Sequence, residues 1–389
     1  MKNLAAILFA ATSVVACVGS AGDGTTGGDD GGSGSDTGSG SGMTNDQWDQ
    51  LLGQRVVDYN AALRTAAIRL TGDLPTMDEI NSISTLTDVA AQKTAYETLL
   101  TAYLARPTFA KQMMGFWQDT FKMGGGTMNE MDTAPAFAAM LSVNDGSYMD
   151  LFTAQTGNCP TFDGTTFTAG TCAGSVQAGV LANPGAMKQF FSNFAFRRVR
   201  WVQETFDCAK FPIEVGAAQD VHGAAPYNGV WPFESISDDQ VGRVNFRDVS
   251  AVVCANCHQT INHIAPLFAY FDDQGAMQTA ISVPTPLDGA PKAELTDYLP
   301  ATETTAWRYQ KPATTIPALG AAMAADPAVA KCGVARIWNW ALGKMDIVDT
   351  LTDVPQETIQ AQQDAFTSSG FKLKQLIFAV YSSDDFVKF

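Results

Sequence analysis

Apolar side chains recur at steps of three and four residues along most of the chain after residue 42, which is the spacing of an amphipathic helix. Residues from Thr44 to about Lys122 are therefore predicted to form helices. The first apolar face consists of Trp48, Leu51, Leu52, Val56 and Tyr59. Thr76 is the predicted N-cap of a second helix, because Glu79 follows three residues later in the pattern of a capping box.

Proline and glycine bound the helices that follow. A third helix is predicted at 94–105, and a fourth at 108–122 after the break at Arg106-Pro107. Three glycines at 124–126 end this region, and residues 133–149 have a mixed pattern.

The spacing of apolar residues changes in the middle of the chain. Residues 161–167 alternate between apolar and polar, which predicts a small β-hairpin. Helical spacing returns at 179–210, with an interruption near Asn183-Pro184, whereas 212–249 and 284–317 are rich in proline and glycine and are predicted to be irregular. Further helices are predicted at 318–325, 329–342, 355–368 and 373–381. The pattern therefore predicts a mainly α fold with a small β insertion.

The start of the chain has the features of an export signal. A basic start precedes an apolar run at 4–15, which is too short to span a bilayer as a mature helix and is typical of a signal peptide. The run ends in Val14-Val15-Ala16-Cys17, which resembles the lipobox of bacterial lipoproteins. Cleavage before Cys17 and attachment of lipid to it are expected. Ordinary cleavage nearby, with Cys17 unmodified, is the alternative.

The segment after the signal is predicted to be a flexible tether. Residues 17–42 are almost all Gly, Ser, Thr and Asp, so they cannot bury a core. Val18 rather than Asp follows the cysteine, and by the same resemblance this favours the outer membrane. The lipid on Cys17 is the one membrane contact that we predict.

The charge of the chain limits its partners. The formal net charge is −16 and the isoelectric point is near 4.5. A nucleic-acid partner and docking onto anionic lipid are therefore excluded from the prediction. An acidic surface suits solubility, or a basic redox partner protein.

Cys254-Ala255-Asn256-Cys257-His258 carries the clearest chemical signal, at the start of a predicted helix. It has the form of a c-type haem attachment site, in which two thiols add to the haem vinyl groups and His258 is the proximal iron ligand. A redox dithiol needs no adjacent histidine. A zinc site needs two further ligands, and only His263 is close. One covalent haem c is the predicted cofactor.

The sixth iron ligand stays open at this stage. Met277 or Met323 is predicted, because thioether ligation is common in cytochromes c, although both residues also suit a core. His222 lies in the irregular segment. His263 is too near His258 along one helix to reach the opposite haem face, so we expect it to be packed or to bond a propionate. A pentacoordinate iron is the remaining alternative.

Arg198 or Arg200 is the predicted partner of the haem propionates, because arginines cluster at this point in a chain that has few basic residues. Otherwise these side chains face solvent or pair with the acidic surface. Phe271, with Phe268 and Tyr270, is predicted to form a wall of the haem pocket or part of the core.

The haem segment resembles a family of modular secreted c-type cytochromes that are built from domains of unknown function. The matching residues are the Cys-x-x-Cys-His motif, Phe271-Asp272 and Gly275, whereas His263 and Ala265 stand where the family usually has Pro and Gly. The resemblance extends to segments at 69–75, 178–181, 198–202, 326–332 and 370–386. It implies helical modules on both sides of a cytochrome c-like domain.

Four cysteines remain after lipid and haem are assigned. They are Cys159, Cys172, Cys208 and Cys332. An even remainder in an oxidising compartment implies two disulfides, for which three pairings exist. A Cys159–Cys172 bond is favoured because it closes a short loop. The family resemblance supports a Cys208–Cys332 bond.

These observations predict the organisation and function of the chain. The predicted parts are a lipoprotein signal at 1–16, a linker at 17–42, a helical module at 43–149, a cytochrome c-like haem domain at 150–345 and a C-terminal helical module at 346–389. The predicted function is one-electron transfer in the cell envelope by a lipid-anchored monohaem cytochrome, with an unidentified redox partner and no assigned catalytic residue. The alternatives are a peroxidase- or oxygenase-like haem enzyme, the cytochrome subunit of a secreted dehydrogenase, and a surface lipoprotein whose haem is structural.

Overall fold

The computed structural model describes residues 50–124, 130–209, 252–284, 292–308, 311–344, 346, 351 and 354–389, excepting the side chains at 252–256 and 259. The chain divides into a first unit, Met1–Gln54, of which residues 50–54 are described, and a second unit, Arg55–Phe389. The elements that position the candidate site belong to the second unit.

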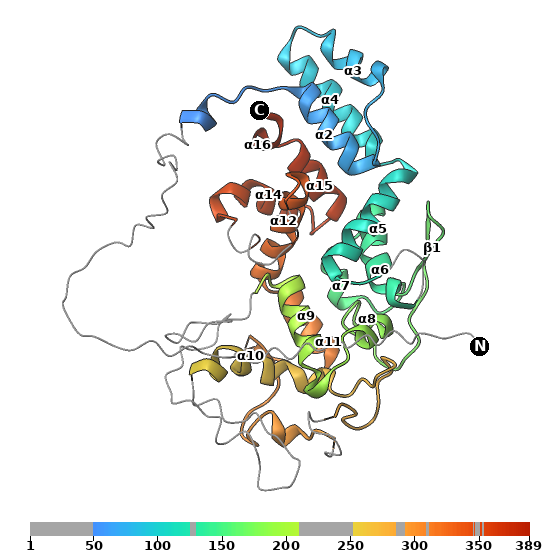
Figure 1. Ribbon diagram of the computed structural model, residues 1–389, viewed down its shortest axis with the longest axis vertical. Helices are drawn as coiled ribbons and strands as arrows, with labels where there is room; N and C mark the ends of the chain where they lie inside the picture. The colour runs from blue at the N-terminus through green and yellow to red at the C-terminus, as the bar shows by residue number, and fades with distance from the viewer. Residues whose placement is uncertain are drawn as a thin grey trace, which may run out of the picture. The chain divides into compact units, whose positions relative to one another are not determined.

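The described part of the second unit is mainly helical, with two small antiparallel sheets, which confirms the predicted fold class (Figure 1). Its N-terminal elements are α2 (Tyr59–Thr71), α3 (Met77–Ser84), α4 (Val89–Tyr103), α5 (Pro107–Phe121), the 3-10 helix η1 (Glu130–Asp132), α6 (Thr133–Val143) and α7 (Asp150–Thr153). Its central elements are β1 (Thr161–Phe162), β2 (Phe167–Thr168), α8 (Pro184–Gln189), the 3-10 helix η2 (Asn193–Ala195), α9 (Phe196–Phe206) and α10 (Val252–Phe268). Its C-terminal elements are the 3-10 helix η3 (Leu295–Asp297), β3 (Ala306–Trp307), β4 (Lys311–Pro312), α11 (Ile316–Ala324), α12 (Pro327–Ala341), α14 (Gln356–Ser368), α15 (Leu373–Tyr381) and α16 (Asp384–Val387).

Side-chain caps set several helix starts. The capping box predicted for α3 is confirmed, since Thr76 Oγ1 accepts from the Glu79 N–H at 3.3 Å and Glu79 Oε2 accepts from the Thr76 N–H at 2.8 Å. Helix α4 begins at Val89, before the predicted start at 94. The reason is a second cap, in which the Asp88 carboxylate accepts from the Ala91 N–H at 2.8 Å.

The first predicted helical face is wrong where it runs through Val56. That residue is 67% exposed and lies in an extended segment that pairs with the C-terminal end of the chain through Val57 and Lys388. Helix α2 starts only at Tyr59, after the Asp58 carboxylate caps it. Pairing with a distant segment therefore overrides the local helical spacing.

The break predicted near Asn183 is instead the start of a helix. The Asn183 side chain caps α8 by accepting from the Ala186 N–H at 3.2 Å. The chain then breaks between α8 and α9, where Phe194 and Ala195 have φ values of 55° and 59°. Helices α11, α12, α14 and α15 agree with the prediction to within the usual uncertainty of helix ends.

Both predicted disulfides are confirmed. Cys159 and Cys172 join the two sides of the β1–β2 hairpin, with a Cα–Cα distance of 4.9 Å. Cys208 and Cys332 join the segment after α9 to α12, with a Cα–Cα distance of 5.4 Å. Two such bonds are typical of a protein outside the reducing cytoplasm. In the part of the chain that the structure describes, no helix has the length and apolar character needed to cross a membrane.

The core around α9 is aromatic. Phe121 of α5 contacts Trp201 and Phe206 of α9, with ring centroids 5.8 and 5.4 Å apart. Phe206 also contacts Phe152 of α7, at 5.0 Å. These edge-on contacts pack α9 against the N-terminal helices, and α10 also packs against α9.

Arg198 of α9 holds the C-terminal end of α10. Its side chain is fully buried and directs all five N–H groups to main-chain carbonyls. The acceptors are Met187 of α8, Phe268 at the end of α10, and Phe271 and Asp272 in the turn that follows, at 2.6–2.9 Å. Burial lowers the pKa of Arg198 to about 10, so the guanidinium is still charged at neutral pH. A cation is thus placed where a helix presents carbonyls that lack intrahelical donors.

The turn after α10 requires glycine at one position. Gly275 has a φ of +78°, and a Cβ atom there would lie 2.1 Å from the carbonyl oxygen of Pro184. The Asp272 carboxylate closes the turn by accepting from the N–H groups of Gln274 and Ala276, each at 2.9 Å. Close packing of α8 against this turn is the physical reason for the glycine.

Replacing Arg198 with Met is expected to lower the free energy of unfolding by about 3–5 kcal/mol, because several buried carbonyls then lose their donors. The Arg198→Lys variant is expected to have a free energy of unfolding between those of Arg198→Met and the wild type, because an ammonium has three donors rather than five. Urea titration followed by far-UV circular dichroism measures the change. Arg200→Met is the matched control, because that side chain is largely exposed, and it should shift stability by less than about 0.5 kcal/mol. Equal stabilities of the Arg198→Met and Arg200→Met variants would contradict the assignment.

Loss of the longer disulfide is expected to destabilise the protein more than loss of the shorter one. The bonds span 124 and 13 residues, and loop entropy alone predicts a difference of about 2 kcal/mol. Urea unfolding of the Cys208→Ser/Cys332→Ser and Cys159→Ser/Cys172→Ser double variants provides the comparison. A greater loss of stability in the Cys159→Ser/Cys172→Ser variant would show that native-state contacts, rather than chain entropy, determine the contribution of each disulfide.

Candidate haem-attachment site

Helix α10 carries the Cys-x-x-Cys-His motif in its first two turns, as the sequence predicts. Positions three and four apart share a helix face, so the backbone places Cys254, Cys257 and His258 on one side of α10. Cys257 is half-buried and packs against the core. The side chain of Cys254 is outside the described set. This shared face is what a covalently attached group with two thioethers and one axial ligand requires.

The His258 imidazole has an amide partner on its own helix. Its Nδ1 atom lies 3.1 Å from Oδ1 of Asn262, one helical turn later. An amide oxygen only accepts, so Nδ1 carries the proton and Nε2 has the lone pair. Burial lowers the pKa of His258, while the bond to Asn262 opposes this shift. The neutral imidazole with a second partner on Nδ1 is the arrangement typical of metal-ligating histidines.

An aromatic side chain from α9 packs against His258, and two further rings pack against that side chain. The ring of Phe196, at the start of α9, meets the imidazole edge-on at 5.1 Å. Phe194 and Tyr298 pack against Phe196, with centroids 5.4 and 6.2 Å away. They make an apolar surround, which would limit the access of water to a bound macrocycle.

Tyr298, which packs against Phe196, has a buried hydroxyl without a partner among the described residues. The residue is fully buried, and its Oη atom has no hydrogen-bond partner in the described part of the chain. Burial raises the pKa of Tyr298 well above its ordinary value, so the hydroxyl remains a donor. A buried hydroxyl of this kind is costly unless something accepts from it. No contact among the described residues places this hydroxyl toward His258, and Arg198 is close enough to oppose the rise in its pKa. The residues that fit a haem are therefore Cys257, His258 and the Phe196 ring, which supply a thiol, an imidazole and an apolar surface.

His263 lies on the same helix but is committed elsewhere. Its side chain is buried, and Nε2 is 3.0 Å from Oε2 of Glu303. The expectation that His263 is packed agrees with this position. The pairing also removes it from the role of a further zinc ligand beside the two motif cysteines.

The two candidate methionines lie in different surroundings. Met277 is half-buried and pairs with Phe271 in the turn after α10, at the opposite end of that helix from His258. Phe268 ends the helix ten residues after His258, about 15 Å along the axis at 1.5 Å per residue. Met323 is fully buried on α11, and β3 packs against both α11 and α10. The distance along α10 counts against Met277, and no contact among the described residues brings Met323 to His258, so a ligand role for Met323 stays a prediction.

The predicted propionate role of Arg198 needs correction. All five of its donors are used by the carbonyls of α8 and the end of α10, so it neither faces solvent nor pairs with acidic side chains. Phe271 is buried beside it, again away from His258. Arg200 is largely exposed and pairs with Glu204 at 2.8 Å, which agrees with the alternative weighed for it. It also lies one turn after Phe196, so a propionate role for Arg200 stays a prediction.

The sequence prediction missed three residues that define this site. Asn262 could have been found, because it stands four residues after His258 on a predicted helix and can reach the imidazole. Phe196 and Tyr298 are distant in the chain, and no sequence signal marked them. Cys17 and His222 are not among the residues that the structure describes.

Comparison of the chain with protein-family models, curated proteins and solved structures finds no match. Function is therefore inferred from the residues of this site.

Proposed function

We propose that this protein is a monohaem c-type cytochrome that carries single electrons in the cell envelope. The observation that supports this most directly is the Cys-x-x-Cys-His motif at the start of α10, with His258 oriented by Asn262. A bound haem would supply the redox chemistry, because its iron accepts and returns one electron.

The chain's own residues would set the conditions for that chemistry. Cys254 and Cys257 would form the two thioethers, and Nε2 of His258 would bind the iron. Asn262 holds the proton on Nδ1 and fixes the ring plane. Phe196 and Tyr298 would exclude water from one side, which shifts the reduction potential by lowering the local dielectric.

The proposed location is outside the cytoplasm. The two disulfides support this, because such bonds persist in oxidising compartments. A lipid on Cys17 would tether the protein, and residues 18–42 would let the folded part stand away from the membrane surface. Attachment to the outer membrane and a basic redox partner belong to the same proposal.

A haem enzyme is the second candidate. Met277 lies beyond the far end of α10, so it is poorly placed to be the sixth iron ligand. Losing one of the two proposed sixth ligands favours an open iron site, which a haem enzyme needs. An iron without a protein ligand on that side could bind peroxide or oxygen.

Protein exported by a host with c-type cytochrome maturation is expected to carry one covalent haem. Intact mass should include one haem, and the colour should survive acid–acetone extraction, because thioethers do not dissociate. The Cys254→Ala/Cys257→Ala variant should lose the haem on extraction. The Cys159→Ala/Cys172→Ala variant is a matched control that removes two cysteines and should keep it. Haem-free wild-type protein from such a host would overturn the proposal.

The sixth ligand is expected to be Met323. Ferric haem with a methionine ligand gives a weak far-red charge-transfer band, so Met323→Leu should abolish this band and allow carbon monoxide to bind the reduced protein. Met277→Leu should keep the band. Leucine conserves volume, so each change should cost less than about 1.5 kcal/mol in stability. Rapid carbon monoxide binding by the wild type would mean an open site and would favour the haem enzyme.

A further inference from the structure

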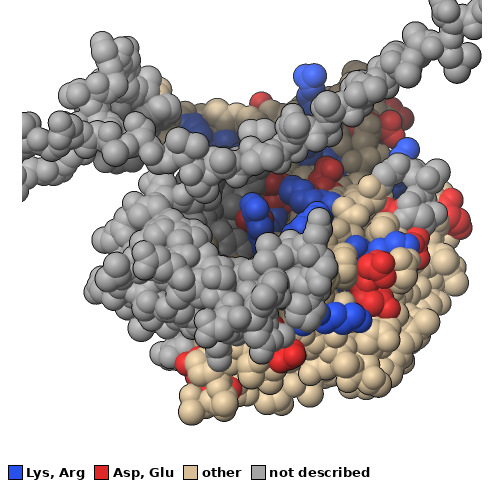
Figure 2. Space-filling model, turned by 60° about the horizontal axis from the view of Figure 1, so that its bottom comes forward, with Lys and Arg blue, Asp and Glu red and all other residues tan. Residues whose placement is uncertain are grey.

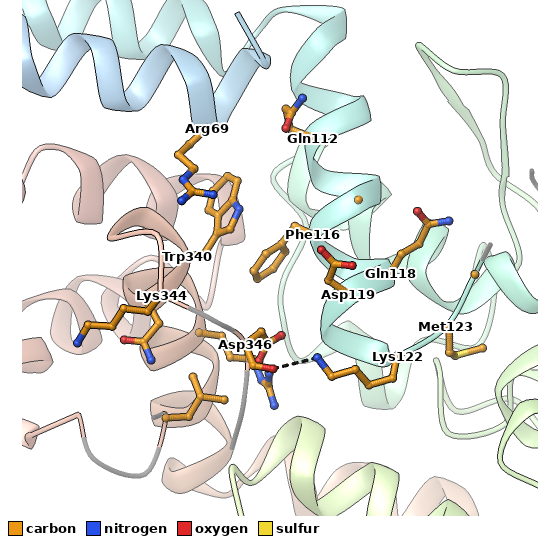
Figure 3. Close-up of a pocket in the computed structure, with 15 residues that line it drawn as sticks. Arg69, Gln112, Phe116, Gln118, Asp119, Lys122, Met123, Trp340, Lys344 and Asp346 are labelled. Carbon is orange, nitrogen blue, oxygen red and sulfur yellow. Dashed lines mark hydrogen bonds and ion pairs between the residues drawn. The ribbon is translucent and has the colours of Figure 1, made fainter. Parts of the chain in front are cut away.

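A cavity of about 740 Å³ lies between α2, α5 and α12, apart from the residues of the candidate haem site. Arg69 projects into it from α2, Phe116 from α5 and Trp340 from α12 (Figure 3). Lys344 and Asp346, from the segment after α12, complete one wall. Its volume is that of a typical small-molecule site, for which about 300–1,000 Å³ is usual.

The charge of this cavity is opposite to that of the whole chain. The sequence has 24 basic and 40 acidic residues. The cavity is nevertheless lined by four cations and two carboxylates: Arg69, Lys122, Arg336 and Lys344, with Asp119 and Asp346. A local excess of positive charge in a strongly acidic protein favours an anionic ligand.

Part of that charge is already used within the protein. Arg336 is buried, pairs with the Asp346 carboxylate, and donates to the main-chain carbonyls of Glu204 and Thr205. Lys122 donates to the main-chain oxygen of Asp346 at 2.9 Å (Figure 3). The cations that remain for a ligand are therefore Arg69 and Lys344.

Arg69 is positioned for such a contact. It is half-buried and lies beside the ring of Trp340 (Figure 3). Its Nη2 atom sits so close to Gly343 that a Cβ at that residue would be 2.5 Å away. Glycine, with a φ of +71°, is what permits this approach. A guanidinium held in this way is suited to bidentate binding of a carboxylate.

Two further features define the ligand. Phe116 and Trp340 are in ring contact, with centroids 5.2 Å apart, and form an aromatic surface beside the cations. Oδ2 of Asp346 is buried and has no donor within the described residues. An acceptor of this kind calls for a hydroxyl or N–H group from a ligand.

A second hollow of about 410 Å³ shares Lys122, Arg336 and Asp346 with the first and adds Arg197 and Arg200. Figure 2 shows Lys and Arg side chains gathered in a hollow of the surface, in agreement with this arrangement. Glu204 also lines this hollow and pairs with Arg200, so Arg197 is the cation that extends the positive charge from the first cavity toward α9.

We infer that the cavity between α2, α5 and α12 binds a small aromatic carboxylate that also has a hydroxyl group. Arg69 and Lys344 pair with the carboxylate, Phe116 and Trp340 contact the ring, and the free oxygen of Asp346 accepts from the hydroxyl. The five side chains that contact the proposed ligand are not among the residues of the haem site, so the inference stands whether or not haem binds.

Isothermal titration calorimetry of the purified exported protein tests this site with four probes. They are 4-hydroxybenzoate, benzoate, 4-hydroxybenzamide and inorganic phosphate. We expect 4-hydroxybenzoate to bind tightest, benzoate to be weaker for lack of the hydroxyl, and the neutral amide to be weaker by about tenfold or more. Binding should weaken as salt is raised, because the pairing is ionic. Equal binding of the acid and the amide, phosphate binding as tightly as 4-hydroxybenzoate, or no heat with any probe would overturn the inference.

Variants locate the binding. Arg69→Gln and Lys344→Gln are each expected to weaken 4-hydroxybenzoate binding by about five- to tenfold or more, since each loses a charged hydrogen bond. Lys93→Gln on α4 removes the same charge from an exposed pair with Glu97 and should leave binding unchanged. Lys344 is exposed, so its variant keeps the test valid if Arg69→Gln fails to fold. Unchanged affinity in Lys344→Gln, or an equal loss in Lys93→Gln, would place the ligand elsewhere.

Discussion

The buried guanidinium of Arg198 fixes the helix on which the proposed chemistry depends. This one side chain donates to the carbonyls of Phe268, the last residue of α10, of Phe271 and Asp272 in the turn after it, and of Met187 in α8. Hydrogen bonds of this guanidinium thus connect α9, which carries it, to α8 and α10. Because α9 also places Phe196 against His258, the contact at one end of α10 positions the imidazole at the other.

The opposite end of α9 is held just as firmly. Arg336 of α12 donates to the carbonyls of Glu204 and Thr205 at 2.6 and 2.9 Å, and the Cys208–Cys332 bond joins the same two segments. Helix α9 is thus fixed to α10 at its start and to α12 at its end. The basic cavity lies beside this second junction, so the two candidate sites share a rigid element while using different residues.

Sequence reasoning identified the residues of the candidate haem site that lie within one helix. Cys254, Cys257 and His258 follow from spacing, and Asn262 follows from the helical repeat once the helix is accepted. The role of Arg198 could not be read in this way, because its acceptors lie about seventy residues further along the chain and are main-chain atoms, which no residue type identifies.

The sequence by itself determined the features that depend on local order: the helical fold class, the capping box of α3, the short disulfide loop and the motif at the start of α10. Each is set by residues within a few positions of one another, where backbone geometry fixes which groups meet. Only the tertiary structure decided that Val56 is extended, that Arg198 is buried and that Arg69 and Lys344 line one cavity. Those outcomes depend on contacts between distant segments, whose packing and burial outweigh local preference.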